Sequence, residues 1–391
     1  MRKLWKAVVA GWKFLVGVVL CQTPFTAVLV VGWTYRLMQR AALRSWWKSA
    51  KTDEDFQAFA DAHEATLGHR TYPNWIVAQN PMTSMPGRWV RQETVFGKLW
   101  CLPWALTASL LENARVGVAG MVNTWVLTLL PAILWVFGWY AGWDKSFNKG
   151  YEQYSVGIVL SLIGIALFVV VMLYVPMAQA RQAVTGRWRS FYEFGKIRAL
   201  IRRRRVACLL LAGCYSVASV PVAILIVFPL FIEQVRPATS EMTDLELLKF
   251  LNTYFLWTGV VGFTAFVVLR VLAARLYAGA VLGAVRAGEV SAHDLSEIEA
   301  ATLERLGLGE SEDRAPRHVA IEVVRKASRP IVRAPLVAAT LVVWFTFVSQ
   351  IYVREFLNYH PVRGWMNQPL VQLPWFRYVP EDLEESARNM P

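Results

Sequence analysis

The sequence predicts an all-α protein: a polytopic transmembrane helical bundle of five to six spans with interfacial amphipathic helices. Hydrophobic residues make up 55% of the 391 residues and the mean hydropathy is +0.36, whereas soluble domains are typically about 45–50% apolar. The apolar residues gather in long runs, and about 20 helical residues cross the roughly 30 Å hydrocarbon core of a bilayer. The chain also has 18 tryptophans, a residue that favours the membrane–water interface.

Five runs are long and apolar enough to predict one span each, at 117–143, 156–177, 206–232, 254–276 and 334–353. A sixth run covers residues 7–35 and contains Pro24. Because proline cannot continue the helical hydrogen-bond ladder and both flanks of the run are basic, this run favours a re-entrant hairpin that turns at Gln22–Pro24. A single crossing is the alternative, and the choice decides between five spans and six.

These runs divide the chain into five regions. Residues 1–51 form the membrane hairpin or single span with a basic flank, and residues 52–116 form a polar cytoplasmic region with an interfacial or buried helix at 99–112. Two two-span units follow. The first, 117–205, ends in a basic amphipathic helix, and the second, 206–333, ends in a cytoplasmic loop. Residues 334–391 hold the last span and a surface tail rich in proline and aromatic residues.

The segment 177–205 carries the most distinctive pattern, MAQARQAVTGRWRSFYEFGKIRALIRRRR. Its apolar residues recur at steps of three and four, which is typical of a helix, and Gly186 predicts a break. A basic amphipathic helix that continues a span is expected to lie in the membrane interface. The alternative is a cytosolic helix that packs on its own protein.

The basic residues predict anionic lipid as a partner. The formal net charge is +13, and the positive residues lie beside apolar spans, where anionic headgroups attract them; nucleic acid is not the expected partner. Loops rich in lysine and arginine face the cytoplasm, which places 177–205 inside. The candidate lipid contacts are Arg187, Arg189, Arg202, Arg203, Arg204 and Arg205.

Motifs for chemistry are not found in the sequence. His63 and His69 do not have the H-E-x-x-H spacing of zinc peptidases, and neither a phosphate-binding glycine loop nor a dinucleotide fingerprint occurs in a strand–helix setting. A G-x-S-x-G nucleophile elbow is absent as well. We therefore predict no catalytic, metal or cofactor residues, and a protein that is not an enzyme.

Polar residues inside the predicted spans are few. Arg270 lies about six residues from the inner end of its span, and we expect its side chain to snorkel to the cytoplasmic interface. Asn123, Thr124 and Thr128 either line a polar path or form hydrogen bonds between helices.

Three runs carry a resemblance to a known group: SFNKGYEQ, YVPMAQARQAVTGRWRSFYEF and GWMNQPLVQLPW. Residues 140–205 and the C-terminal tail resemble an uncharacterised family of bacterial multi-spanning inner-membrane proteins. The resemblance implies a multi-pass protein of the bacterial inner (plasma) membrane, and it implies no activity.

The function expected from these features is that of a non-catalytic integral membrane protein, a scaffold or accessory subunit of a membrane assembly. Its expected partners are the anionic inner leaflet and either other membrane subunits or further copies of itself. The alternative is a channel or uncoupled small-solute transporter. Prolines within spans favour that alternative, as does a weak repeat between the two two-span units, because transporter folds use internal repeats.

Overall fold

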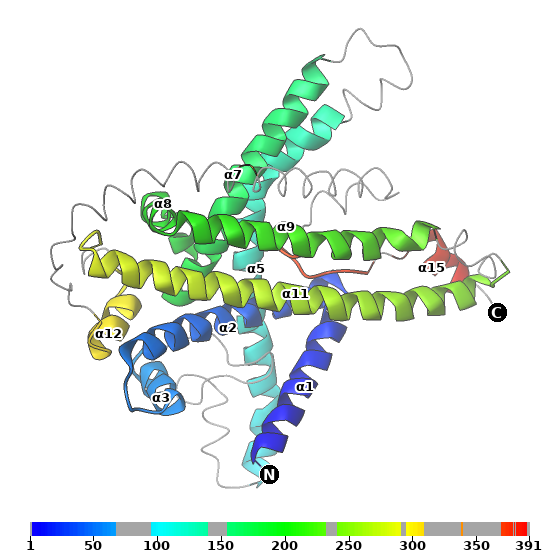
Figure 1. The fold of residues 1–391 in the computed structure, drawn as a ribbon. Helices are drawn as coiled ribbons and strands as arrows, with labels where there is room; N and C mark the ends of the chain where they lie inside the picture. The colour runs from blue at the N-terminus through cyan, green and yellow to red at the C-terminus, as the bar shows by residue number, and fades with distance from the viewer. Residues whose placement is uncertain are drawn as a thin grey trace.

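The computed structural model describes residues 2–67, 95–139, 155–231, 241–290, 295–308, 338, 369–377, 379 and 381–388. Every regular element within these ranges is a helix, which confirms the all-α class for this part of the chain (Figure 1). The predicted loop at 144–154 and the predicted last span at 334–353 fall outside the described residues, apart from residue 338.

The N-terminal pair consists of α1 (Arg2–Leu20) and α2 (Pro24–Ala50). The helix breaks at residues 21–23, where the side chain of Thr23 accepts a hydrogen bond from the Thr26 amide at 3.3 Å and Pro24 opens α2. Proline suits the first turn of a helix because its missing N–H has no helical partner there. The two helices diverge from this turn (Figure 1), and α3 (Phe56–Leu67) follows α2. The placement of this pair in a membrane stays a prediction.

Two long helices, α5 (Val95–Trp139) and α7 (Ser155–Thr185), pack along each other. Helix α5 has 45 residues and so measures about 68 Å at 1.5 Å per residue. The segment 99–112 is part of this one helix, and its placement in the membrane interface stays a prediction.

The segment 177–205 is divided between two environments. Residues 177–185 continue α7 and are all buried, so this part does not lie in an interface. Gly186 has a φ of +67°, a conformation that favours glycine, and the predicted break occurs there. The chain continues as η4 (Trp188–Tyr192) and α8 (Phe194–Arg203), in which only Ile197 and Leu200 are buried.

A second long pair lies side by side across the first (Figure 1). It consists of α9 (Arg205–Val227), extended by η5 (Phe228–Phe231), and α11 (Asp244–Arg286). Thr243 and Glu246 cap the start of α11 reciprocally, each side chain meeting the other residue's amide. Two short helices complete the described fold: α12 (Glu297–Arg305) beyond α11 and α15 (Glu381–Arg388) beside its first turns.

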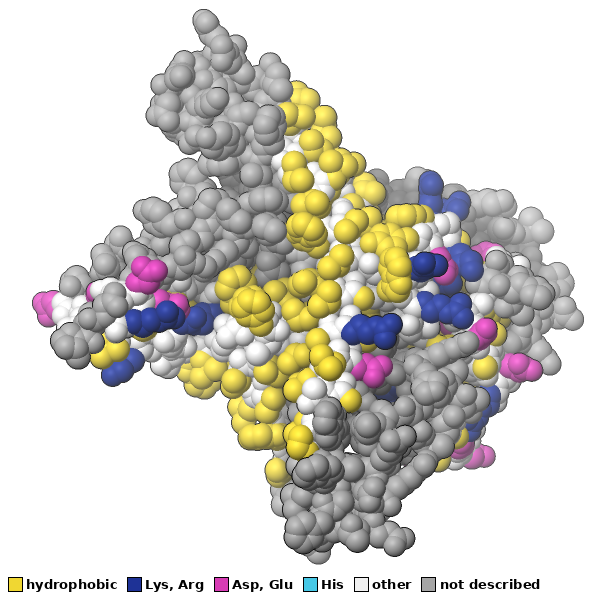
Figure 2. All heavy atoms as spheres, turned by 180° about the vertical axis from the view of Figure 1, so that it is seen from behind, with side chains coloured by type: hydrophobic (Ala, Val, Ile, Leu, Met, Phe, Trp, Pro, Cys, Tyr) yellow, Lys and Arg dark blue, Asp and Glu magenta, His cyan; other side chains and the backbone are white. Residues whose placement is uncertain are grey.

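Two helices among the described residues are long and apolar enough to cross a membrane, Arg205–Ile226 and Asp244–Arg286. Only 33% and 44% of their most apolar windows are buried, so more than half of the residues in each window keep part of their surface exposed. Figure 2 shows hydrophobic side chains in a band between two ends that carry charged side chains. The count of five to six spans stays a prediction.

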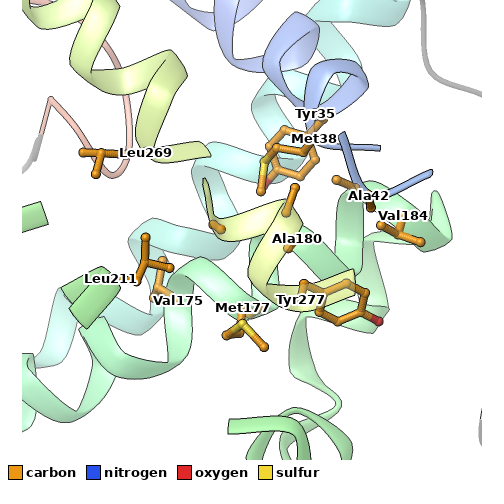
Figure 3. Close-up of a cluster of buried hydrophobic side chains, with 14 of the residues drawn as sticks. Tyr35, Met38, Ala42, Val175, Met177, Ala180, Val184, Leu211, Leu269 and Tyr277 are labelled. Carbon is orange, nitrogen blue, oxygen red and sulfur yellow. The ribbon is translucent and has the colours of Figure 1, made fainter. Parts of the chain in front are cut away.

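The core lies where α2, α7, α9 and α11 meet. Figure 3 shows Tyr35, Met38 and Ala42 of α2 among side chains of the other three helices. The Trp46 indole donates to the Ala278 carbonyl at 2.9 Å and ties α2 to α11.

The extended segment 369–377, which we call the strap, is drawn in orange-red between α9 and α11 in Figure 1. Residues 369–374 and Phe376 are buried. This part of the tail therefore lies in the core and not on the surface, because its side chains Leu370, Val371 and Leu373 join the main hydrophobic cluster.

Candidate functional site

The first polar cluster surrounds Arg181, near the end of α7. Its Nη1 donates to the Tyr277 hydroxyl at 2.9 Å and to Glu299 Oε2 at 3.5 Å, and its Nε donates to Glu193 Oε2 at 2.8 Å. The Tyr277 hydroxyl in turn donates to Glu299 Oε1. The arginine is 3% exposed and Glu299 is fully buried. The cluster joins α7, α11 and α12 to the segment before α8.

The carboxylate of Glu299 is fixed locally as well. The backbone amide and the hydroxyl of Ser296 each donate to Glu299 Oε2 at 2.9 Å, forming the capping box of α12. One carboxylate thus caps a short helix and neutralises a buried guanidinium. Burial by itself lowers the pKa of Arg181, but the nearby Tyr277, Glu299 and Glu193 outweigh burial and raise this pKa. The side chain therefore stays charged.

The second polar cluster links α5 to α7. Asn123 Nδ2 donates to Gln182 Oε1 and to the Trp188 carbonyl, both at 3.0 Å. The Tyr192 hydroxyl donates to Asn123 Oδ1 at 3.1 Å, and burial raises the pKa of Tyr192, which keeps this donor protonated. Gln179 Nε2 donates to the Thr124 hydroxyl at 2.7 Å. Of the two roles expected for the polar residues of span 117–143, the structure shows hydrogen bonding between helices.

The strap extends this cluster. Gln372 Nε2 donates to the Thr128 hydroxyl at 2.5 Å. The Val371 carbonyl accepts from Gln179 Nε2 at 3.1 Å and from Arg270 Nη2 at 2.7 Å. A single carbonyl of the strap thus connects α7 and α11, and it uses both of its lone pairs to do so.

Arg270 does not snorkel to an interface, contrary to the sequence-based expectation. Its side chain is 1% exposed, because the strap lies over it and offers a carbonyl acceptor. The guanidinium carbon lies 4.8 Å from the ring centroid of Phe266 and 6.0 Å from that of Tyr35. In the part of the chain that the structure describes, neither Asp nor Glu forms an ion pair with Arg270.

The six arginines predicted to contact lipid are all exposed, but they differ in their partners. Arg203 Nη1 lies 2.7 Å from Glu289 Oε1, and Arg204 Nη2 donates to the Gly279 carbonyl at 3.3 Å, so both reach toward the end of α11. Arg187 lies 3.8 Å from Glu297, and Arg189 lies over the Trp188 ring at 5.4 Å.

Among the described residues, Arg202 and Arg205 do not share the α11 contacts of Arg203 and Arg204. Arg198 and Arg202 lie four residues apart on α8, which places them on one side of that helix, and Arg205 opens α9; all three are exposed. Arg198 is absent from the six predicted residues, although its spacing from Arg202 gives the signal that could have found it.

The structure also brings together residues that sequence reasoning missed. Arg181 lies in the segment predicted to be a basic amphipathic helix and Glu299 in the predicted cytoplasmic loop, yet they meet across 118 positions of sequence. The S-x-x-E pattern at Ser296–Glu299 signals a helix start, but it does not signal a buried partner. Among the described residues, no group of three or more His, Cys, Asp or Glu side chains is placed to hold a metal ion.

Comparison with known families places part of this site within a recognised sequence pattern. Residues 102–231 match the family described as "Protein of unknown function (DUF4013)". Comparisons with curated proteins and with solved structures give no match. The match covers about a third of the chain, from within α5 to the end of η5, and includes Arg181 and the basic helix α8. Over that third, this chain is similar to a family that has no assigned activity.

Proposed function

We propose that this chain is a non-catalytic, multi-pass protein of the bacterial inner membrane that acts as a scaffold or accessory subunit of a membrane assembly. The observation that carries the proposal is the distribution of side chains on α5. Val118, Val122, Val126 and Leu130 recur at steps of four and are exposed, whereas Asn123, Thr124 and Thr128 are buried. A water-soluble helix normally has the opposite distribution.

The internal use of polar groups supports a scaffold over a channel. The three polar residues of α5 each bond to another element, through Gln182, Gln179 and Gln372. Such interhelical bonds are typical of packed membrane bundles and contribute about 0.6 kcal/mol each on average. A pore would instead direct polar side chains toward water.

The two ends of the α9–α11 pair support a crossing of the membrane. One end carries the arginines of α8 and the start of α9, and the other carries Glu241, Asp244 and Glu246. Between them lie exposed apolar side chains such as Leu210, Val217, Trp257 and Val261. The lysine–arginine rule puts the α8 end in the cytoplasm.

A reconstitution experiment tests the choice between scaffold and channel. The full chain is placed in lipid vesicles that contain a panel of small solutes and ions, and release is compared with that from protein-free vesicles. The proposal expects equal release. Release that exceeds the control, and that the Asn123→Leu variant alters, would establish the channel alternative.

Co-purification tests the scaffold role directly. We expect extraction of the full chain in a gentle detergent to yield a defined assembly with a second membrane subunit or a further copy of the chain. Strictly monomeric protein without any associated membrane protein, under conditions in which other assemblies of the same membrane survive, would contradict it.

The lipid role belongs to the three exposed arginines Arg198 and Arg202 of α8 and Arg205 at the start of α9. Each basic residue near an anionic leaflet contributes about 1 kcal/mol. Replacing all three with Gln should therefore weaken phosphatidylglycerol binding about 100-fold, because each 1.4 kcal/mol is a factor of about ten. Native mass spectrometry of the detergent-purified chain measures the retained lipid. Arg203→Gln is the matched control, since Arg203 bonds to Glu289, and equal lipid loss in both variants would refute the assignment.

A further inference from the structure

Arg270 is a buried cation whose hydrogen-bonding capacity is mostly unused. Its Nη2 donates to the Val371 carbonyl, but its Nε and Nη1 have no hydrogen-bond partner among the described residues. A guanidinium has five N–H donors and cannot lose its charge at accessible pH. Three N–H groups of a fully charged side chain therefore point to a partner that the described residues do not supply.

A second buried donor belongs to the same core. The Tyr215 hydroxyl on α9 is also buried without a hydrogen-bond partner in the described structure, and Tyr215 is part of the same hydrophobic cluster as Phe266, whose ring lies against the Arg270 guanidinium. Tyr35 of α2 presents its ring to that guanidinium and also bonds to it through its hydroxyl. The unused donors thus gather where α2, α9 and α11 meet, in the core and away from the exposed arginines of α8.

Burial of the Arg270 charge costs solvation free energy, which other interactions have to offset. An ion moved from water into a protein interior loses much of its solvation even after the protein relaxes. The rings of Phe266 and Tyr35 as cation–π partners and the hydrogen bond to the Val371 carbonyl return only part of it. Buried polar groups are otherwise almost always satisfied, so several unused donors together indicate a ligand and not a packing defect.

We propose that Arg270 and Tyr215 form an internal oxyanion site that binds a phosphate group. The unused atoms of Arg270 are all donors and the Tyr215 hydroxyl can also donate, and donors around a cation select an anion with several acceptor oxygens. Gln179 Oε1, an unused acceptor on the residue that shares the Val371 carbonyl, is the exception nearby. The strap bond is compatible with this ligand, because Val371 uses Nη2 and leaves Nε and Nη1. The phosphate belongs either to a lipid headgroup or to free inorganic phosphate, two sources with the same recognition chemistry.

Binding assays on the full chain in detergent test the site. Radiolabelled inorganic phosphate, and separately short-chain phosphatidic acid, are titrated against the unmodified chain and against the variants Arg270→Gln and Tyr215→Phe. We expect one equivalent to bind the unmodified chain, Arg270→Gln to weaken binding at least 100-fold, and Tyr215→Phe to weaken it about tenfold. Arg203→Gln, which removes one exposed arginine, should leave binding unchanged.

The two probes distinguish a site for free phosphate from a site for a lipid headgroup. Saturable binding of inorganic phosphate establishes a site for the free ion, whereas binding of phosphatidic acid alone establishes a lipid site. Thermal unfolding provides a second readout that does not depend on the label, since a ligand of the native state raises the unfolding temperature by an amount that grows with the logarithm of its concentration relative to Kd. If neither probe binds, or if Arg270→Gln binds as well as the unmodified chain while remaining folded, the proposal is wrong and ordered water satisfies these donors.

Discussion

Arg181 on α7 and Arg270 on α11 are both buried, yet they are neutralised in opposite ways. Arg181 contacts two carboxylates and a tyrosine hydroxyl contributed by three other parts of the chain. Arg270 contacts one neutral carbonyl, two aromatic rings and the Tyr35 hydroxyl. Burial alone therefore does not define the role of a charged residue. Arg181 is neutralised by carboxylates and holds several helices together, whereas Arg270 keeps N–H donors available for a ligand.

The largest effect is expected from Arg181→Met. This change leaves Glu299 buried without its cationic partner, and breaking a buried ion pair in this way typically costs about 3–5 kcal/mol. Thermal or denaturant unfolding in a fixed detergent, followed by tryptophan fluorescence, measures the loss. The double variant Arg181→Met/Glu299→Gln should recover part of it, because the uncompensated carboxylate is gone. A double variant that is as unstable as the sum of the two single variants would show that the residues do not act as a pair.

Gly262→Ala should give the next largest loss, about 1–3 kcal/mol, as is typical of overpacking. A Cβ at position 262 would collide with the ring of Phe376, which lies in the strap that supplies the carbonyl partner of Arg270. The matched control is Gly195→Ala on α8, where a Cβ meets nothing within 4 Å. That control should be neutral or stabilising by up to about 1 kcal/mol. Equal behaviour of the two variants would contradict the buried strap.

Arg270→Met should change stability little, by less than about 1 kcal/mol in either direction. The substitution removes a charge without leaving an opposite charge unpaired, and replacing buried ionic groups with apolar ones is often neutral or stabilising. The Val371 carbonyl keeps its bond from Gln179. The same unfolding assay in phosphate-free buffer checks this, and a loss comparable to that of Arg181→Met would show that Arg270 is also a structural clamp.

Arg187→Gln should have the smallest effect, within about 0.5 kcal/mol. Its ion pair with Glu297 spans 3.8 Å between side chains that are 58% and 65% exposed, and exposed pairs contribute little because water screens them. The unfolding assay again applies. A loss above about 1 kcal/mol would mean that surface charge, and not burial, sets the contribution of an arginine in this protein.

Local features of this fold were predictable from the sequence, and distant contacts were not. Apolar periodicity predicts the long helices, and Gly186 and Pro24 mark real breaks because both residues restrict the local backbone. The contacts of Arg270 were missed because its partner carbonyl lies 101 residues away in the strap. The strap itself reads as a surface tail because of its prolines, although its apolar residues Leu370, Val371, Leu373 and Phe376 were a signal of burial.

In the candidate site, too, local features were predictable from the sequence and contacts between distant residues were not. The exposed arginines of α8 could be identified from their run in the sequence, since exposure requires no partner. That Arg203 and Arg204 reach α11 whereas Arg198, Arg202 and Arg205 do not share these contacts could not be predicted, because the contacts depend on Glu289 and Gly279, which lie more than 70 residues away.

The central claim of this account, that α11 crosses the membrane, is tested most directly by cysteine labelling at its two ends. Glu289→Cys and Ser386→Cys are introduced separately into a chain whose four cysteines are replaced with alanine. Glu289 pairs with Arg203 at one end of α11, and Ser386 bonds to Asp244 at the other. A membrane-impermeant maleimide is then applied to intact cells and to inverted vesicles. The account predicts labelling of position 386 only from outside and of position 289 only from the cytoplasmic side; labelling of both from the same side would contradict it.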